Sequence, residues 1–377
     1  VLEEMLPYFT EKFGNPSSLY GIGLSAKSDL NRARAKVAKL IGSEEREIYF
    51  TSSGTEADNW AVIGAARANK SKGNHIITSS IEHHAVLHSC NYLEKYGFKI
   101  TYLPVDEYGL ISLEDLNNAI KEDTILISIM FANNEIGTIQ PIKEIGKIAK
   151  ENKIYFHTDG VQALGNTVID VEDMNIDLLS ISSHKIYGPK GIGALYIRKG
   201  VKIDPLIHGG AQEHRKRAGT ENVPGIVGFG KAAEIAYDNL EKNIENLTNL
   251  RNKLINGILD HIDYVKLNGH PQNRLPGNIN ISFQFIEGEA LLLSLDMVGI
   301  CGSSGSACTS GTLDPSHVLL AIGLSHEIAH GSLRLSLGKY TKEEDINFVL
   351  KELPKIISRL RSMSPLYEKV KGGEKNV

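Results

Sequence analysis

Short apolar runs alternate with longer amphipathic segments through the first half of the chain. The runs are rich in β-branched residues and have the length of strands, so each predicts a strand. The predicted strands are residues 47–51, 75–79, 99–103, 124–130, 154–157 and 176–181. The predicted helices between them are residues 57–68, 85–96, 113–120 and 142–152. This alternation indicates an α/β fold with a mainly parallel sheet and helices on both faces.

The second half of the chain has a less regular pattern. A long helical tract covers residues 222–258 and weakens around Asn243. Farther on, the predicted elements are strands at residues 264–267 and 278–282 and a helical tract at residues 343–363. Pro354 is expected to break or kink the last tract. Because 377 residues exceed one ordinary core, we expect a large domain at residues 1–245 and a smaller α+β domain at residues 246–377.

Polar side chains follow four of the predicted strands. The clusters are Glu82-His83-His84, Asn133-Asn-Glu135, Asp159-Gly-Val-Gln162 and Ser182-Ser-His-Lys185. In open α/β sheets, ligands bind beyond the carboxyl ends of the strands. A single polar residue at a strand end is usually satisfied locally, but four clusters at one edge of a sheet predict a site.

Lys185 and Asp159 indicate which ligand the site binds. Burial at the end of a strand would lower the pKa of a lysine and free its amine to attack a carbonyl. The simpler alternative is a solvated lysine at the edge of a loop. Asp159 ends another apolar run, so the two side chains can hold opposite sides of one pyridine ring. The carboxylate would keep the ring nitrogen protonated while the lysine condenses with the aldehyde, which predicts pyridoxal phosphate as cofactor.

The stretch Ser52-Ser-Gly54-Thr55-Glu56 lies between a predicted strand and a predicted helix. A glycine, a hydroxyl and the first N–H groups of a helix suit a phosphate, although an ordinary helix N-cap has the same residues. The Gly- and Arg-rich segment 208–220 is a surface loop, or it reaches the phosphate or a neighbouring subunit.

Cys308 stands in a run of small and hydroxylated residues, 302–311. Such a loop cannot pack a core, so Cys308 suits a nucleophile that must travel; a bystander thiol in a surface loop is the alternative. Cys301 follows apolar residues and fits a structural cysteine. Arg334 lies in an apolar, strand-like context and requires a carboxylate, either from the protein or from a substrate.

Composition narrows the function classes. A formal net charge of −4 gives no reason to expect nucleic acid or an anionic membrane as partner. No apolar run reaches the ~18 residues of a membrane span, and we expect no signal peptide. Three cysteines are too few for a disulfide framework, which fits the cytoplasm. Val1 already lies in a helical pattern, so we expect a leading segment before it.

Eight stretches together resemble the cysteine desulfurases of the NifS/IscS type, within the fold-type I aminotransferase superfamily. They are Phe13-Gly-Asn-Pro-Ser-Ser18, Thr51-Ser-Ser-Gly-Thr-Glu56, Glu82-His83, Asn133-Asn-Glu-Ile-Gly137, Asp159-Gly-Val-Gln162, Ser182-Ser-His-Lys185, Arg217-Ala-Gly-Thr-Glu-Asn222 and Ser303-Ser-Gly-Ser-Ala-Cys-Thr-Ser310. The resemblance implies a fold-type I transferase with a mainly parallel seven-stranded sheet. It also implies a strand with a Leu-Asp-x-x-Ala-Thr-Thr-like stretch before the first helix, which this sequence does not contain.

The resemblance implies a role for each matching residue. Lys185 would condense with the cofactor, Asp159 would pair with the pyridine nitrogen, and His83 would stack on the ring and accept the thiol proton. Further cofactor contacts would come from Gln162 to the ring hydroxyl, from Asn134, and to the phosphate from Gly54, Thr55, Ser182, His184 and, across a homodimer, Thr220. Asn134 and Arg334 would hold the carboxylate of the substrate, L-cysteine.

The implied reaction removes sulfur from L-cysteine, giving L-alanine and a persulfide on Cys308. The implied partners are a second copy of the chain and an iron–sulfur scaffold or another sulfur acceptor. No intrinsic metal site is expected, although Cys308 could ligate an iron–sulfur cluster transiently with a scaffold. A selenocysteine lyase or an aminotransferase on the same fold is the first alternative, and a binding protein without catalysis is the second.

Overall fold

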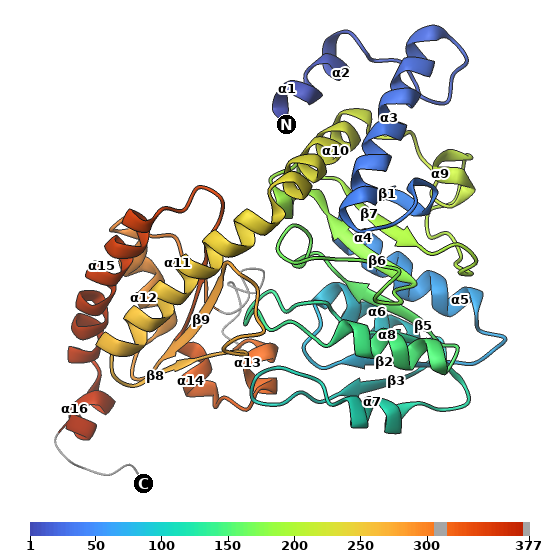
Figure 1. Cartoon of the computed structure of the whole chain (residues 1–377). Helices are drawn as coiled ribbons and strands as arrows, with labels where there is room; N and C mark the ends of the chain where they lie inside the picture. Colours follow the sequence, from blue (N-terminus) through green and yellow to red (C-terminus); the bar gives the residue numbers. More distant parts are fainter. Residues whose placement is uncertain (305–314, 372–377) are drawn as a thin grey trace. The chain divides into compact units, whose positions relative to one another are not determined.

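The computed structural model describes residues 1–304 and 315–371, and the chain divides into two compact units (Figure 1). Unit 1 comprises Val1–Leu103, Ile111–Ala132 and Gln140–Leu240, and unit 2 comprises Pro104–Leu110, Asn133–Ile139 and Glu241–Val377. Two short segments from the first half of the chain thus belong to unit 2. The domain assignment made from the sequence, residues 1–245 and 246–377, stays a prediction.

Unit 1 contains a seven-stranded sheet. Its strands are β1 (Ile48–Thr51), β2 (His75–Ser79), β3 (Lys99–Leu103), β4 (Thr124–Ser128), β5 (Tyr155–Asp159), β6 (Leu178–Ser182) and β7 (Gly193–Ile197). Their order is β1-β7-β6-β5-β4-β2-β3; β7 is antiparallel to both of its neighbours, and the other pairs are parallel. The predicted α/β class and the mainly parallel seven-stranded sheet are confirmed.

Unit 1 also contains helices and helical turns. They are α1 (Leu2–Met5), α2 (Pro7–Thr10), α3 (Gly21–Leu40), α4 (Gly54–Asn59), the π-turn η2 (Trp60–Gly64), α5 (Ala65–Ala68), α6 (His84–Glu94), α7 (Leu113–Ala119), α8 (Ile142–Glu151), α9 (Gln212–Arg215) and α10 (Val223–Asp238), with 3₁₀ turns η1 (Glu45–Glu47) and η3 (Ser183–Ile186). Strands β2, β4, β6 and β7 are buried at every residue, which requires cover on both faces. On one face, Trp60 and Val86 join Ile76 and Leu126 in a core cluster.

Unit 2 has a three-stranded antiparallel sheet in the order β10-β9-β8. Its elements are α11 (Leu240–His261), β8 (Val265–Leu267), β9 (Asn278–Phe283), α12 (Gly288–Asp296), α13 (His317–Ala321), α14 (His326–His330), β10 (Ser332–Ser336), α15 (Glu343–Ser362) and α16 (Pro365–Lys371). Apolar side chains of α11, α12 and α15 pack with β9 and β10 in one core. No helix in the described ranges is long and apolar enough to cross a membrane.

Three elements differ from the sequence prediction. The helical tract at 222–258 is two helices that meet at Asn239, four residues before the weak point expected at Asn243. Helix α15 continues through Pro354, because Leu353, Ile356 and Ile357 bury its apolar face and outweigh the missing hydrogen bond. Strand β7 follows β6 through the 3₁₀ turn η3, with no α-helix between them, so strand–helix alternation did not predict it.

Candidate active site

Three of the predicted polar clusters lie at the carboxyl ends of strands in unit 1. Asp159 is the last residue of β5, Ser182 is the last residue of β6, and His83 follows β2 as the N-cap of α6. Strands β5 and β6 are parallel neighbours with Asp159 opposite Ser180. The sheet therefore brings these side chains to one edge, as the sequence predicts.

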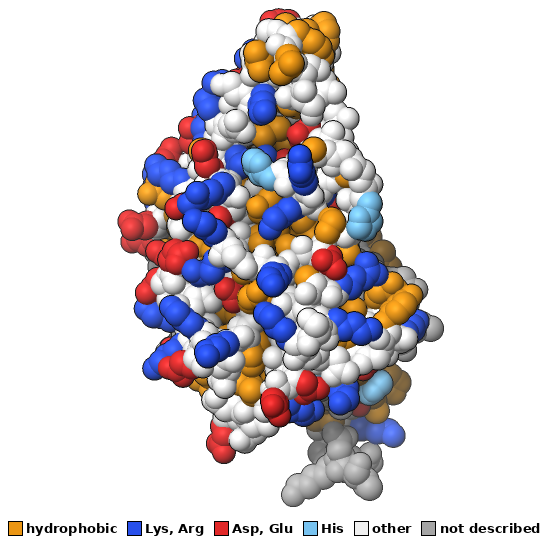
Figure 2. All heavy atoms as spheres, turned by 90° about the vertical axis from the view of Figure 1, so that its right-hand side faces the viewer, with side chains coloured by type: hydrophobic (Ala, Val, Ile, Leu, Met, Phe, Trp, Pro, Cys, Tyr) orange, Lys and Arg blue, Asp and Glu red, His pale blue; other side chains and the backbone are white. Residues whose placement is uncertain are grey.

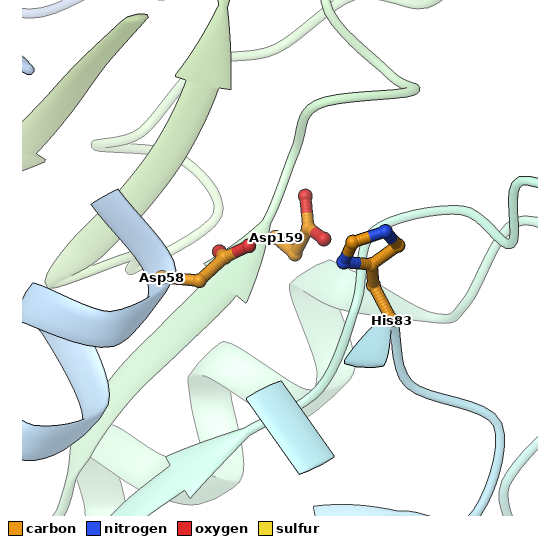
Figure 3. A group of neighbouring side chains, drawn as sticks. All are labelled: Asp58, His83 and Asp159. Atoms are coloured by element: carbon orange, nitrogen blue, oxygen red, sulfur yellow. The ribbon is translucent and has the colours of Figure 1, made fainter. Parts of the chain in front are cut away.

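Asp159 is buried beside His83 and Asp58. The ligand atoms of the three side chains lie within 4.8 Å of one another (Figure 3). Burial raises the pKa of Asp159, while a hydrogen bond from the Val161 N–H (2.9 Å) and the charges of His83 and Lys185 lower it. Asp159 ends β5, and Lys185 lies three residues beyond the end of the parallel neighbour β6, so both follow adjacent strands at the same edge of the sheet.

The backbone fixes the tautomer of His83. Its Nδ1 accepts a hydrogen bond from the N–H of Ala85 (3.1 Å) and so caps α6. A nitrogen that accepts from an N–H carries no proton, so the neutral ring has its proton on Nε2.

Lys185 differs from the expectation of a desolvated amine. It lies in the 3₁₀ turn η3, beyond the end of β6, and it is exposed in the single chain, as is His184. The turn ends at Tyr187, which has a left-handed backbone (φ 66°). The predicted burial is wrong for the chain alone because this turn directs both side chains out of the sheet layer. The pKa of His184 is lowered by partial burial and by the charges of Lys185 and Lys190.

The start of α4 forms a narrow cradle. A Cβ atom on Gly54 would lie 2.7 Å from Cγ2 of Val161 and 3.5 Å from Cβ of Ser182, so only glycine fits this approach. Ser53 caps the helix, accepting from the N–H of Glu56 (3.1 Å). Thr55 is exposed and Ser182 is buried.

The negative charge of Glu56, beside the cradle, is paired with Arg217. Its carboxylate accepts from Nε of Arg217 (2.9 Å) and from the N–H of Ser52 (2.7 Å). Burial raises the pKa of Glu56, but the hydrogen bonds from Arg217 and Ser52 lower it by more. The net pKa is therefore below the ordinary value, and the carboxylate stays ionised. The paired charge leaves the first turn of α4 able to accept an anion.

Gln162 and Thr220 also belong to unit 1. Gln162 is half-buried in the turn that follows Asp159. Thr220 is exposed, and together with Thr51, Ser52 and Arg217 it lines a cavity of about 210 Å³.

Asn134 and Arg334 belong to unit 2. Nη1 of Arg334 donates to the carbonyl oxygen of Asn134 (3.1 Å), and the backbone of Arg334 pairs with Ser303 in an isolated bridge. The structure thus brings the two predicted carboxylate-binding residues together. Cys308 lies outside the described residues. Cys301 is exposed, so its expected structural role is wrong.

Sequence reasoning did not identify Asp58. The signal available was a carboxylate four residues after Gly54 on the same helix, so that one turn carries both to one side. The pattern of this segment, an N-cap followed by an Ala-rich helix, indicates a function only for the N-terminus of the helix.

The chemistry of the side chains gathered in unit 1 fits pyridoxal phosphate. Asp159, His83 and Asp58 also form a possible metal-binding set of one imidazole and two carboxylates. However, the positive charge of Lys185 acts on Asp159, which opposes a second cation there. An amine, a buried acid and a glycine cradle instead suit a ring that carries an aldehyde and a phosphate.

Comparison with known proteins gives the same family throughout. The model of the aminotransferase class-V family matches residues 1–349. The chain is 64% identical to cysteine desulfurase IscS of Methanosarcina thermophila over 98% of this chain and 91% of that protein. It is 65% identical to cysteine desulfurase IscS of Clostridium botulinum over 98% of this chain and 93% of that protein.

Among solved structures, one described as a NifS-like protein superposes with a TM-score of 0.89 at 43% identity, covering 95% of both chains. Another, described as SspA in complex with cysteine, has a TM-score of 0.80 at 40% identity and covers 90% of this chain and 95% of that one. Fold and relatives agree, and the chain belongs to the class-V aminotransferase family, among the cysteine desulfurases of the NifS/IscS type.

Proposed function

We propose that this chain is a cysteine desulfurase that uses pyridoxal phosphate to remove sulfur from L-cysteine. The products are L-alanine and a persulfide on Cys308. Identity of 64–65% to proteins named cysteine desulfurase over 98% of the chain supports the reaction. The single structural observation that carries the proposal is the position of buried Asp159 beside His83 at the sheet edge where Lys185 follows the neighbouring strand β6.

Nine residues of unit 1 would hold the cofactor. Asp159 would pair with the ring nitrogen, His83 would lie against the ring, Gln162 would bond the ring hydroxyl, and Lys185 would supply the amine. Gly54, Thr55, Ser182 and His184 would bind the phosphate, and Thr220 would reach the phosphate of a partner subunit. From unit 2, Asn134 would add a further contact. Bound pyridoxal phosphate supplies an aldehyde and a ring that withdraws electrons.

The chain's own groups would move the protons and the sulfur. The amine of Lys185 takes the α-proton of the bound cysteine, and the negative charge of Asp159 holds a proton on the ring nitrogen. The thiolate of Cys308 attacks the substrate sulfur; the carbon–sulfur bond breaks, the carbon gains a proton, and the sulfur stays on Cys308 as a persulfide. Because Nδ1 of His83 caps α6, accepting the thiol proton would require that cap to open.

Arg334 and Asn134 would bind the carboxylate of the substrate. Arg334 is half-buried, with one N–H held by the carbonyl oxygen of Asn134, so its guanidinium is oriented before a ligand arrives. A related protein is described in complex with cysteine, which supports this substrate class for the present chain.

A homodimer is the proposed assembly. Large apolar side chains are exposed on α1, α2, the segment joining α2 to α3, and the start of α3; they are Leu2, Leu6, Phe9, Phe13, Leu19, Tyr20, Ile22 and Leu24. Figure 2 shows hydrophobic side chains gathered at the upper end of the view, where Figure 1 places the segment between α2 and α3. A patch of this kind marks an interface, and a second copy would also supply Thr220.

The persulfide would pass to an iron–sulfur scaffold or another sulfur acceptor, and the cytoplasm is the proposed location. No nucleic-acid or membrane partner is proposed. The charge balance of the chain and its three cysteines support this assignment. During transfer, Cys308 could ligate a cluster on the scaffold.

Alanine release from L-cysteine by the chain with added pyridoxal phosphate tests the proposal. Cys308→Ser should keep the absorbance of the bound cofactor and its change on adding cysteine, but it should form no persulfide. Cys301→Ser is the matched control and should behave as wild type. Alanine and sulfide formation at near wild-type rate in Cys308→Ser would instead favour a lyase or aminotransferase on the same fold.

A further inference from the structure

Asp58 is a buried acid that the reaction above does not use. It lies on α4 with 1% of its surface exposed, and its carboxyl points toward Asp159 (Figure 3). Its ligand atom lies within 4.8 Å of those of Asp159 and His83. Its Oδ1 has no hydrogen-bond partner among the described residues. A buried carboxylate in such a place would be strongly disfavoured.

Among the residues that the structure describes, no lysine or arginine forms an ion pair with Asp58. The nearest basic group is His157, whose Nε2 lies 3.7 Å from Oδ1 of Asp58. His157 is fully buried, and its two nitrogens are hydrogen-bonded to the hydroxyls of Ser128 (2.8 Å) and Ser180 (3.0 Å). Burial lowers the pKa of His157 to about 3. The ring is therefore neutral near neutral pH, and the contact with Asp58 is not an ion pair.

Three buried carboxyls, those of Asp58, Glu82 and Asp159, influence one another here, and each has a different set of neighbours that shifts its pKa. Burial, followed by the charge of Asp159, raises the pKa of Asp58 well above its usual range, although Ser180 lies close enough to lower it in part. Burial raises the pKa of Glu82 to about 8. Burial raises the pKa of Asp159 too, but a hydrogen bond from the Val161 N–H (2.9 Å) and the nearby charges of His83 and Lys185 lower it in part, so Asp159 is the carboxyl with basic side chains beside it. Neighbouring carboxyls in one site do not all ionise together.

We propose that Asp58 is a positioning residue that works as a neutral carboxylic acid, holding its proton so that the negative charge of the cluster rests on Asp159. In this form the carboxyl fills the space between α4 and the end of β5 without competing for the protonated ring nitrogen. A second anion at this position would share the ring proton and disturb the geometry of Asp159. This inference rests on the proposed cofactor site.

The substitution Asp58→Asn tests the charge, because an amide has the shape of a protonated acid and can still donate a hydrogen bond. We expect its dissociation constant for pyridoxal phosphate, measured by absorbance titration, to stay within about twofold of wild type. Asp58→Ala removes the carboxyl and opens a cavity. It should weaken cofactor binding by about tenfold, the lower end of what removing a supporting residue costs at comparable sites.

Infrared spectroscopy tests the proton directly. The wild-type chain should show the carbonyl stretch of protonated carboxylic acids, and Asp58→Asn should lose one contribution to it both with and without cofactor. Glu82→Gln is the matched control and should lose a separate contribution. Asp58→Ser is a smaller polar replacement that serves in place of Asp58→Ala if that variant does not fold.

Two results would overturn the proposal. A tenfold or greater loss of cofactor affinity in folded Asp58→Asn, with the infrared band unchanged, would show that the charge of Asp58 is used. Wild-type affinity in both Asp58→Ala and Asp58→Ser would show that Asp58 positions nothing. A wild-type chain that binds no pyridoxal phosphate would contradict the proposed function instead, while the infrared band of the cofactor-free chain would still report the protonation of Asp58.

Discussion

His83 combines two tasks that substitution can separate. Its Nδ1 caps α6 through Ala85, and its ring lies beside Asp159. Asparagine can still cap a helix, whereas alanine cannot, so His83→Ala should lower the free energy of unfolding by about 1 kcal/mol and His83→Asn by far less. Both should reduce alanine release by about 100-fold, because neither supplies the ring. Denaturant titration and the alanine assay separate the two effects.

A control on the same helix makes this test specific. His88→Asn changes an exposed histidine of α6 and should alter neither stability nor turnover. Full activity in His83→Asn would remove the ring from the mechanism and leave His83 as a cap.

The stability of the chain should depend on pH through Glu82. The folded pKa, about 8, is above the ordinary value of 4.5, so the folded chain retains a proton that the unfolded chain releases. The resulting stability is complete below about pH 4.5 and is lost as pH rises through about 8. Glu82→Gln should reduce the fall in unfolding free energy over this window by roughly a few kcal/mol.

Thermal or denaturant unfolding across this window measures the effect. Asp58 shifts in the same direction, so Glu82→Gln removes only part of the slope. Glu122→Gln, at an exposed position, is the control. Equal slopes in wild type and Glu82→Gln would show that Glu82 is ionised in the folded chain.

Among the elements, the segment around α9 depends on one buried ion pair. Glu213 binds Nη1 and Nη2 of Arg34 (2.7 and 2.8 Å) and accepts from the N–H of Phe50 (2.9 Å). Glu213, His214 and Arg215 all have left-handed backbones, a conformation that non-glycine residues adopt only when neighbouring contacts compensate for the strain. The ion pair therefore holds the segment that continues to Thr220.

Glu213→Gln should destabilise the chain by about 3–5 kcal/mol, because it leaves the Arg34 charge buried without its partner. Cofactor affinity should fall in parallel as the segment before Thr220 loosens. Asp173→Asn, which breaks the exposed pair with Lys143, should cost less than about 1 kcal/mol. Equal losses in the two variants, measured by denaturant unfolding, would contradict a supporting role for Glu213.

The elements also show where sequence reasoning succeeds. Period and β-branching predicted β1 to β6 to within a few residues, because these strands are short and rich in β-branched residues, and all except the edge strand β3 are mostly buried. Strand β7 has similar residues, but it follows β6 through η3 and pairs antiparallel both with β6 and with the distant strand β1. The exposure of Lys185 likewise depends on the turn ending at Tyr187. Asp58 could not be identified from the sequence, because a single aspartate forms no motif. Its role depends on which side chains face α4 in the folded chain.

At the scale of the whole molecule, the predicted site residues are divided between two units with separate cores. Asp159, His83 and Lys185 belong to unit 1, whereas Asn134 and Arg334 belong to unit 2. The segment Asn133–Ile139 is held in unit 2 because Asn278 and Asn280 donate to the carbonyl oxygen of Glu135. These contacts join residues about 140 positions apart in the chain, and such pairings leave no shift in composition from which the sequence could indicate them.

The apolar patch of α1 to α3 gives the last prediction, which concerns assembly. The double variant Phe13→Asp and Leu19→Asp places two charges where side chains are 70% and 90% exposed. We expect sedimentation to show a dimer for wild type and a monomer for the variant, because burying either charge in an interface is costly. The variant should also bind pyridoxal phosphate less tightly, since Thr220 would no longer come from a second copy. Met297→Asp, 82% exposed in unit 2, should remain dimeric. A wild-type chain that stays monomeric, or a variant that stays dimeric, would mean that the patch serves another partner and that one copy completes its own phosphate site.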